Sequence, residues 1–581
     1  MRALSLFAVL ALAKIVVIAG HAPDLRVWSP AAYLWQDIAC ALLFAGFERA
    51  AVHLGFRRLA WIVYGALVLY AAANIPVGRA VFTPLTWPML RAARGPLADS
   101  LLLYATPTNA ILVLSTIAVA MILPRFLRRM PRRLYGIAAA GAIPALILGP
   151  FAAARTPTLG MDRNVVGALL RSALPHIKAG AREGVYPAAP FAASPGEDLS
   201  WLFGAARSRN IVMVSLESTA AQYLPMYGGD PRVAPRLAAL ADRAVVFENA
   251  YAAYPESIKG LFSILCSTFP SFDSSTASYA SLPCASLPEL LAGAGYHTAL
   301  FHSGRFAYLG MNAIVRNRGF RTLEDAGDIG GNRRSSFGVD EPSAVARMLD
   351  WIDALPRGGR FFLTYLPIAG HHPYETPARG PFHDSTDLDR YRNAIHYGDA
   401  SLGQLIDGIR QRGLGGETVW VVFGDHGEAF GQHAGNFGHT FYLYEENVHV
   451  PLVIAVPGLP RQVRARKIIS LVDVAPTILD LAGLTAPPLY QGRSGLDPSP
   501  RLALFFADYS LGLLGLRDQR WKFIYEIDSG REELFDLERD PAERSNLSAN
   551  EQFRAERYRG IVLNWSGAQK NYLAAMAGRR R

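Results

Sequence analysis

The chain has 581 residues, of which 51% are hydrophobic, and it carries a formal net charge of +10 at pH 7. With only three cysteines, a scaffold built on disulfides is excluded. The positive charge comes mainly from arginines that lie between apolar runs, a pattern that indicates membrane topology rather than nucleic-acid binding.

Apolar runs fill the first part of the chain, and each is close to the ~20 residues that a helix needs to cross a bilayer. They cover residues 4–20, 33–54, 59–77, 101–127 and 134–153. The sequence therefore predicts a five-helix transmembrane region over residues 1–155. A cleaved signal peptide is the alternative for the first run, and Lys14 within that run suits neither interpretation.

Basic residues are concentrated in two of the connections between these runs. Arg57 and Arg58 lie in one, and five arginines lie within residues 124–134 in the other. The positive-inside rule places both connections in the cytoplasm. Five crossings then place the chain after residue 155 outside the membrane.

Residues 156–205 differ from both neighbouring regions, and we expect an interfacial helix followed by a linker. Apolar side chains recur at helical spacing between Val165 and Leu174, with charged residues among them, as in helices that lie on a membrane surface. Residues 186–198 are rich in proline and alanine, which is typical of a linker.

Residues 206–570 alternate short apolar runs with helical patterns, which predicts an α/β sandwich. The runs at 211–216 and 418–423 have the continuous apolar character of buried parallel strands, and those at 361–366 and 451–456 are similar. In such sheets, ligands bind at the carboxyl ends of the strands.

Metal-binding residue types follow three of these runs. Glu217 follows the run at 211–216, His371 follows that at 361–366, and Asp425 and His426 follow that at 418–423. Polar residues often follow a strand, so each alone is weak, but together they form a mixed oxygen and nitrogen ligand set. Such a set, with a serine oxygen, suits one divalent ion, Mn²⁺ or Zn²⁺, with Mg²⁺ as a further candidate.

Ser257 stands directly before a helical pattern, in the stretch YPESIKGLFSILCS. As an ordinary N-cap it would stabilise that helix by ~1 kcal/mol. A helix N-terminus also favours a deprotonated hydroxyl and a bound phosphate, so a nucleophile is the second interpretation.

In their order and spacing, several motifs resemble the sulfatase-like branch of the alkaline phosphatase superfamily. They are LEST (216–219), the Ser257 helix, HHPY (371–374), DHGE (425–428) and VHVPLVI (448–454), with C-terminal segments at 471–484 and 532–547. The resemblance implies an alkaline phosphatase/sulfatase-like α/β sandwich as the catalytic domain.

The residues after Ser257 depart from the formylglycine sulfatases, which carry x-Pro-x-Arg after their Cys or Ser. Here Lys259 and Leu261 take the Pro and Arg places, and a single acid, Glu217, replaces the usual paired aspartates. With the membrane region, this resembles lipoteichoic acid synthases, phosphoethanolamine transferases and periplasmic-glucan phosphoglycerol transferases. Those families usually place Thr at position 257, so Ser257 is a chemically mild departure.

Carried over motif by motif, the resemblance implies a metal site and a substrate site. The metal ligands would be Glu217, Ser257, Asp425 and His426, with Ser257 also the catalytic nucleophile; the substrate-binding residues would be His371, His302, His439 and Arg305. Ser257 would carry a phospho-serine intermediate, and His439 would serve the leaving group or a second metal.

We therefore expect a metal-dependent transferase, anchored by several helices in a bacterial inner or cell membrane, with its catalytic domain on the periplasmic or extracellular side. It would move phosphoglycerol or phosphoethanolamine from a phospholipid donor to a glycan or lipid acceptor. The alternatives are a tethered sulfatase or phosphodiester hydrolase, and a non-catalytic binding domain. No nucleic-acid partner is expected, and the oligomeric state stays open.

The cysteines provide one further expectation. Cys266 and Cys284 both lie outside the membrane in this topology, where an oxidising compartment favours a disulfide over two buried thiols. Cys40 lies in an apolar run and is expected to be unpaired.

Overall fold

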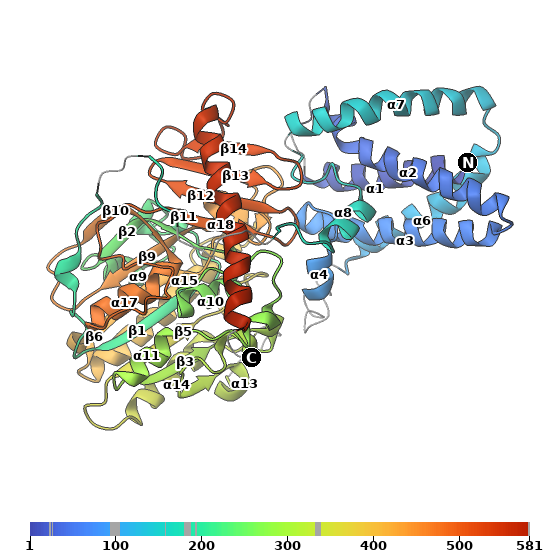
Figure 1. Cartoon of the computed structure of the whole chain (residues 1–581). Helices are drawn as coiled ribbons and strands as arrows, with labels where there is room; N and C mark the ends of the chain where they lie inside the picture. The colour runs from blue at the N-terminus through green and yellow to red at the C-terminus, as the bar shows by residue number, and fades with distance from the viewer. Residues whose placement is uncertain are drawn as a thin grey trace. The chain divides into compact units, whose positions relative to one another are not determined.

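The computed structural model describes residues 1–21, 25, 27–92, 105–156, 158–178, 187–191, 195–331 and 338–578 (Figure 1). The chain divides into two compact units. The first is Met1–His176 with Gly431–Gly438 and Tyr509–Leu511, and the second is Ile177–Phe430, His439–Asp508 and Gly512–Arg581. The segment around residue 165, predicted to be interfacial, therefore belongs to the same unit as the N-terminal apolar helices.

Among its described residues, the first unit has α-helices and one short strand, β8 (Phe437–Gly438). Its helices are α1 (Arg2–His21), α2 (Ser29–His53), α3 (Arg57–Val81), α4 (Trp87–Ala92), α6 (Pro107–Leu127), α7 (Arg132–Arg155) and α8 (Val165–Ser172). In α1, α2, α3 and α6 the length and hydropathy suffice to cross a membrane, and the described part of α7, Ala140–Arg155, is a shorter apolar helix. These helices confirm the predicted apolar region, although residues 101–104 of the fourth run lie outside the described residues.

Lys14, the charge that suited neither interpretation of the first run, lies in a buried ion pair. Its Nζ is 2.6 Å from Oδ2 of Asp37 on α2. Oδ1 of Asp37 accepts a hydrogen bond from the side chain of Asn164 at 2.7 Å, and Asn164 also caps α8 by accepting from the amides of Val166 and Gly167. A charge inside an apolar helix is thus neutralised by a partner, as charges in membrane segments generally are.

A central eight-stranded sheet, in the order β10-β2-β9-β6-β1-β5-β3-β4, organises the second unit. Its strands are β1 (Asn210–Leu216), β2 (Val245–Tyr251), β3 (His297–His302), β4 (Thr322–Glu324), β5 (Phe361–Leu366), β6 (Thr418–Gly424), β9 (His449–Ala455) and β10 (Val463–Ser470). The predicted strands in β1, β5 and β6 are parallel neighbours. The expectation for 451–456 was wrong in direction, because β9 runs antiparallel to β2 and β6. A run that is buried on both faces does not encode the direction of its strand.

Both faces of the sheet are covered. Ile211 and Met213 of β1 lie in one apolar cluster, whereas Val212 and Val214 lie in another. Successive strand residues point to opposite faces, so each cluster occupies one face of the sheet. The predicted α/β sandwich is therefore confirmed.

Helices and a second sheet complete this unit (Figure 1). The helices are α9 (Pro235–Ala241), α10 (Ser257–Cys266), α11 (Leu287–Gly293), α12 (Asn312–Val315), α13 (Ala326–Ile329), α14 (Glu341–Asp353), α15 (Asp387–Gln411), α16 (Glu445–Val448), α17 (Val474–Ala482) and α18 (Gln552–Gly578). An antiparallel sheet is built from β11 (Ala503–Ala507), β12 (Leu513–Asp518), β13 (Trp521–Glu526) and β14 (Glu532–Asp536), and β7 (Ala429–Phe430) is a further short strand outside these two sheets. Cys266, at the end of α10, is bonded to Cys284, which confirms the expected disulfide, and Cys40 is free.

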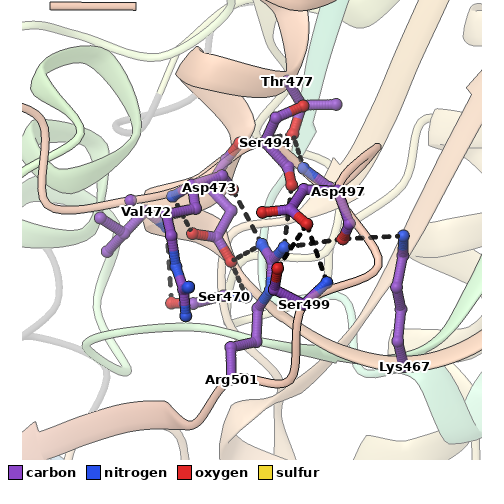
Figure 2. A network of polar contacts seen from close by, with 12 residues as sticks. Lys467, Ser470, Val472, Asp473, Thr477, Ser494, Asp497, Ser499 and Arg501 are labelled. Atoms are coloured by element: carbon purple, nitrogen blue, oxygen red, sulfur yellow. Dashed lines mark hydrogen bonds and ion pairs between the residues drawn. The ribbon is translucent and has the colours of Figure 1, made fainter. Parts of the chain in front are cut away.

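A buried ion pair fixes the segment before α17 (Figure 2). Nη1 of Arg501 lies 3.1 Å from Oδ2 of Asp473, and each side chain is only 2% exposed. Asp473 also accepts from the amides of Ser470 and Arg493. Two buried charges need each other as partners. We therefore assign Asp473, the acid in LVDVAPTIL, a structural role.

Candidate active site

The carboxyl ends of β1 and β6 bring the predicted metal ligands together. Leu216 pairs with Gly424 at the end of these neighbouring parallel strands, so the residues that follow them meet. Glu217, Asp425 and His426 are buried, and each offers a ligand atom within 4.8 Å of those of the other two. The structure therefore assembles this part of the predicted set.

The turn after β1 is shaped by close contacts. Ser218 has a left-handed backbone with φ of 52°. Its amide donates to Oδ1 of Asp425 at 3.0 Å, and its hydroxyl donates to Oε1 of Glu217 at 2.9 Å. A Cβ on Gly424 would lie 2.2 Å from the carbonyl oxygen of Thr219, so only glycine allows the two strand ends to approach this closely.

Ser257 completes the cluster as the first residue of α10. Its Oγ lies 2.9 Å from Oε2 of Glu217 and 3.1 Å from Nε2 of His426. The N-cap interpretation of Ser257 was wrong, because the cap is Glu256, whose carboxylate accepts from the amide of Lys259 at 3.2 Å. Because the capping contact is made one residue earlier, the Ser257 hydroxyl is directed at the side chains of Glu217 and His426.

The two positions that depart from the formylglycine pattern have structural partners. Nζ of Lys259 lies 3.0 and 3.1 Å from the carboxylate oxygens of Asp508, and Lys259 is 6% exposed. Leu261 is 3% exposed within an apolar cluster. Position 261 therefore has no positive charge that could interact with a phosphoryl or sulfuryl group bound to Ser257.

The pKa values of the two carboxylates in the cluster are shifted in opposite directions. Burial disfavours the ionised form of Glu217, but the nearby imidazoles of His426, His371 and His439 outweigh it and lower its pKa to about 2. Burial raises the pKa of Asp425 to about 7, and the charge of His426 offsets this only in part. Two carboxylates and an imidazole within one buried cluster are oxygen and nitrogen ligands of the kinds that Zn²⁺ and Mn²⁺ take, so the donor set fits a divalent cation.

A second group of contacts adjoins the first through Glu428, which was not among the residues predicted from the sequence. Oε2 of Glu428 lies 2.6 Å from Nδ1 of His439, and its Oε1 accepts from the hydroxyl of Tyr374 at 2.6 Å. The rings of His439 and His426 stack with centroids 4.1 Å apart. Glu428 is the last letter of DHGE, so its place in that motif was the available signal.

The remaining predicted residues lie at the ends of β3 and β5. These strands are parallel neighbours, with His302 paired to Leu366. Nδ1 of His302 lies 2.9 Å from the carbonyl oxygen of Leu366, and burial lowers the pKa of this imidazole. His371 follows β5, and its charge acts on Glu217. Arg305 is an exposed residue in the loop after β3, and its role stays a prediction.

Parts of this chain are similar to known proteins. Residues 209–484 match the Sulfatase family model. Arylsulfatase K of Bos taurus is 34% identical over 173 residues, covering 26% of this chain and 31% of that protein. Lipoteichoic acid synthase 2 of Bacillus subtilis (strain 168) is 26% identical over 326 residues, covering 52% of this chain and 50% of that protein. The chain thus spans half or less of the length of these two relatives.

Two solved structures share the fold. A protein in the alkaline phosphatase superfamily from Vibrio parahaemolyticus has a TM-score of 0.54 at 21% identity, covering 69% of this chain and 91% of that one. The lipoteichoic acid synthase LtaP from Listeria monocytogenes has a TM-score of 0.50 at 18% identity, covering 64% of this chain and 94% of that one.

Proposed function

Because residues 209–484 match the Sulfatase family model and the chain shares the fold of a protein in the alkaline phosphatase superfamily, we propose that it is a membrane-anchored, metal-dependent phosphotransferase. It would move phosphoglycerol or phosphoethanolamine from a phospholipid to a glycan or lipid acceptor outside a bacterial cell. The observation that carries this proposal is the Ser257 hydroxyl, held within hydrogen-bond distance of Glu217 and His426 at a helix N-terminus. The apolar helices and the lipoteichoic acid synthase relative support the membrane setting.

The metal site would use Glu217, Asp425, His426 and the Ser257 oxygen. A bound Mn²⁺, Zn²⁺ or Mg²⁺ supplies positive charge that favours the deprotonated serine and offsets charge on the phosphoryl oxygens. The chain itself holds these donors close together in a buried site, where electrostatic interactions are strong.

In the first step, Ser257 reacts as its deprotonated oxygen, after its proton has passed to water. Oγ forms a bond to the donor phosphorus, and the bond from phosphorus to the lipid glycerol oxygen breaks. The leaving oxygen takes a proton and departs as diacylglycerol. His439 is the candidate proton donor, because Glu428 holds its Nδ1 and its ring stacks on His426.

In the second step, an acceptor hydroxyl forms a bond to the phosphorus of phospho-Ser257. The bond from phosphorus to Oγ breaks, which restores the serine oxygen, and the acceptor proton passes to a base. His302 is the candidate base, because burial lowers its pKa and Nδ1 faces a carbonyl oxygen, so Nε2 keeps a free lone pair. Splitting the transfer into two displacements is the general advantage of covalent catalysis.

A hydrolase is the second candidate. The higher identity to arylsulfatase K, over a shorter segment, favours it. In that function water would take the place of the acceptor, or a sulfate ester the place of the phospholipid.

The test uses the full chain in vesicles of phosphatidylglycerol and phosphatidylethanolamine, with Mn²⁺ or Zn²⁺. We expect diacylglycerol release, loss of release on chelation, and recovery when metal is restored. Ser257→Ala should lower the rate by about 10³-fold or more, because the nucleophile is removed. Turnover of an aryl sulfate without diacylglycerol release would instead establish the sulfatase.

A further inference from the structure

Glu341 is a buried acid that no sequence motif singled out. It is the first residue of α14, and it is only 1% exposed. Its carboxylate accepts hydrogen bonds from four donors. They are the hydroxyl of Ser303 and the amides of Ile368 and Ala369, each at 2.9 Å from Oε1, and the hydroxyl of Tyr365 at Oε2.

Three of these donors lie on the loops that carry the predicted substrate histidines. Ser303 directly follows His302 at the end of β3, and Ile368 and Ala369 lead from β5 toward His371. The loops also bond to each other, since the Ile368 amide donates to the Ser303 hydroxyl at 2.9 Å. Glu341 therefore lies at the point where the two loops contact each other.

The residues that flank these anchor points have little freedom. A Cβ on Gly304 would lie 2.4 Å from Nε2 of His302. A Cβ on Gly370 would lie 2.5 Å from the carbonyl oxygen of Glu217, so the second loop packs against the backbone of a predicted metal ligand. A shift of either anchor would therefore move an imidazole relative to the Glu217 cluster.

The chemistry of the contact requires a carboxylate. An ionised carboxylate accepts at both oxygens and donates nothing, which matches four converging donors. Hydrogen bonds to an ionised group are roughly twice as strong as neutral ones. Glutamine would keep the shape of this side chain but would lose the charge and one acceptor.

We propose that Glu341 is a positioning residue for the substrate half of the site. Its carboxylate holds the β3 and β5 loops in the arrangement in which His302 and His371 face one phosphoryl group. This inference rests on the proposed function and on the predicted roles of His302 and His371 in binding its substrate. Glu341 itself touches neither the substrate nor the metal ligands.

The test compares Glu341→Gln with Glu324→Gln in the full chain loaded with Mn²⁺. Glu324 also contacts α14, through an ion pair with Arg347 at 2.6 Å, but it does not bond to either loop, so it is a matched control. Calorimetry gives the Kd of inorganic phosphate, and hydrolysis of bis(p-nitrophenyl) phosphate gives kcat and KM. Neither probe depends on the lipid donor.

We expect Glu341→Gln to raise the phosphate Kd and the KM about 10-fold and to lower kcat/KM by up to about 10²-fold, the effect of a small misplacement. The Tm and the bound metal should match those of Glu324→Gln. Unchanged phosphate affinity would overturn the proposal, and so would a wild-type chain that binds no phosphate.

A second variant covers the case in which Glu341→Gln unfolds. Ser303→Ala removes one donor, and a selective loss of phosphate affinity at normal Tm would support the proposal, whereas normal affinity would overturn it. If the wild-type chain hydrolyses the diester but releases no diacylglycerol, the proposed lipid transfer is wrong. The role of Glu341 in binding phosphate is still tested by these variants in that case.

Discussion

At the scale of single residues, Ser257 shows how a neighbouring side chain frees a nucleophile. Glu256 makes the capping contact of α10, so the hydroxyl of Ser257 turns to Glu217 and His426 instead. Serine is a favoured N-cap residue, and local sequence therefore predicted that role for position 257. The Ser257 hydroxyl instead contacts Glu217 and His426, which lie 40 and 169 residues away along the chain. Local helix propensity cannot predict such distant contacts.

Glu428→Gln should lower kcat by about 10–100-fold, the usual effect of losing a residue that orients a site imidazole. Glu428 accepts from both His439 and Tyr374, and an amide offers one acceptor for these two donors. Steady-state kinetics on bis(p-nitrophenyl) phosphate measure this, with the exposed Glu375→Gln as control. Equal kcat values in the two variants would contradict the orienting role.

At the scale of elements, the apolar runs predicted the strands that form the site. The sequence located β1, β5 and β6 and the polar residues after each, because buried parallel strands have a continuous apolar pattern. It did not locate the anchor at Glu341, whose four donors lie 24 to 38 residues away along the chain. Such contacts depend on how the loops cross, which no periodicity encodes.

Asp399 predicts a pH dependence of folding. It lies on α15 and caps α9 by accepting from the amides of Arg236 and Leu237 at 2.7 and 2.8 Å. Burial raises its pKa from 3.8 to about 6. The folded protein then binds the proton more tightly than the unfolded chain, so this contribution to stability is present below about pH 4 and is lost as the pH rises through about 6.

Asp399→Asn should remove this dependence, because the amide cannot titrate. Between about pH 4 and 6 the free energy of unfolding of wild type should fall, relative to the variant, by about 3 kcal/mol. Thermal unfolding of both full-length proteins across this range measures the difference. Parallel stability profiles would show that the carboxyl titrates normally.

At the scale of the whole molecule, hydropathy and arginine placement predicted an apolar helical region before an α/β domain, and the structure has both. The partner of Lys14 could not be predicted, because Asp37 lies on another helix and its pairing depends on how these helices pack. The membrane side of the domain remains a prediction from the positive-inside rule.

Cysteine labelling in cells tests that topology, in a Cys40→Ala background. Leu54 is exposed beside Arg57 and Arg58, and Glu417 is exposed in the second unit. An impermeant maleimide should label Glu417→Cys in intact cells but Leu54→Cys only after permeabilisation, since basic loops stay in the cytoplasm. The reverse pattern would place the site on the wrong side for an extracellular acceptor.

Peptide mass spectrometry shows whether Ser257 carries the transferred group. The full chain is incubated with Mn²⁺ or Zn²⁺ and both phospholipids, quenched without acceptor, and compared with Ser257→Ala. We expect a phosphoglycerol or phosphoethanolamine adduct on the peptide that contains Ser257, absent from the variant, and the mass of the adduct names the head group. The mass loss for oxidation of serine to formylglycine, with no adduct, would contradict the phosphotransferase proposal and identify a sulfatase.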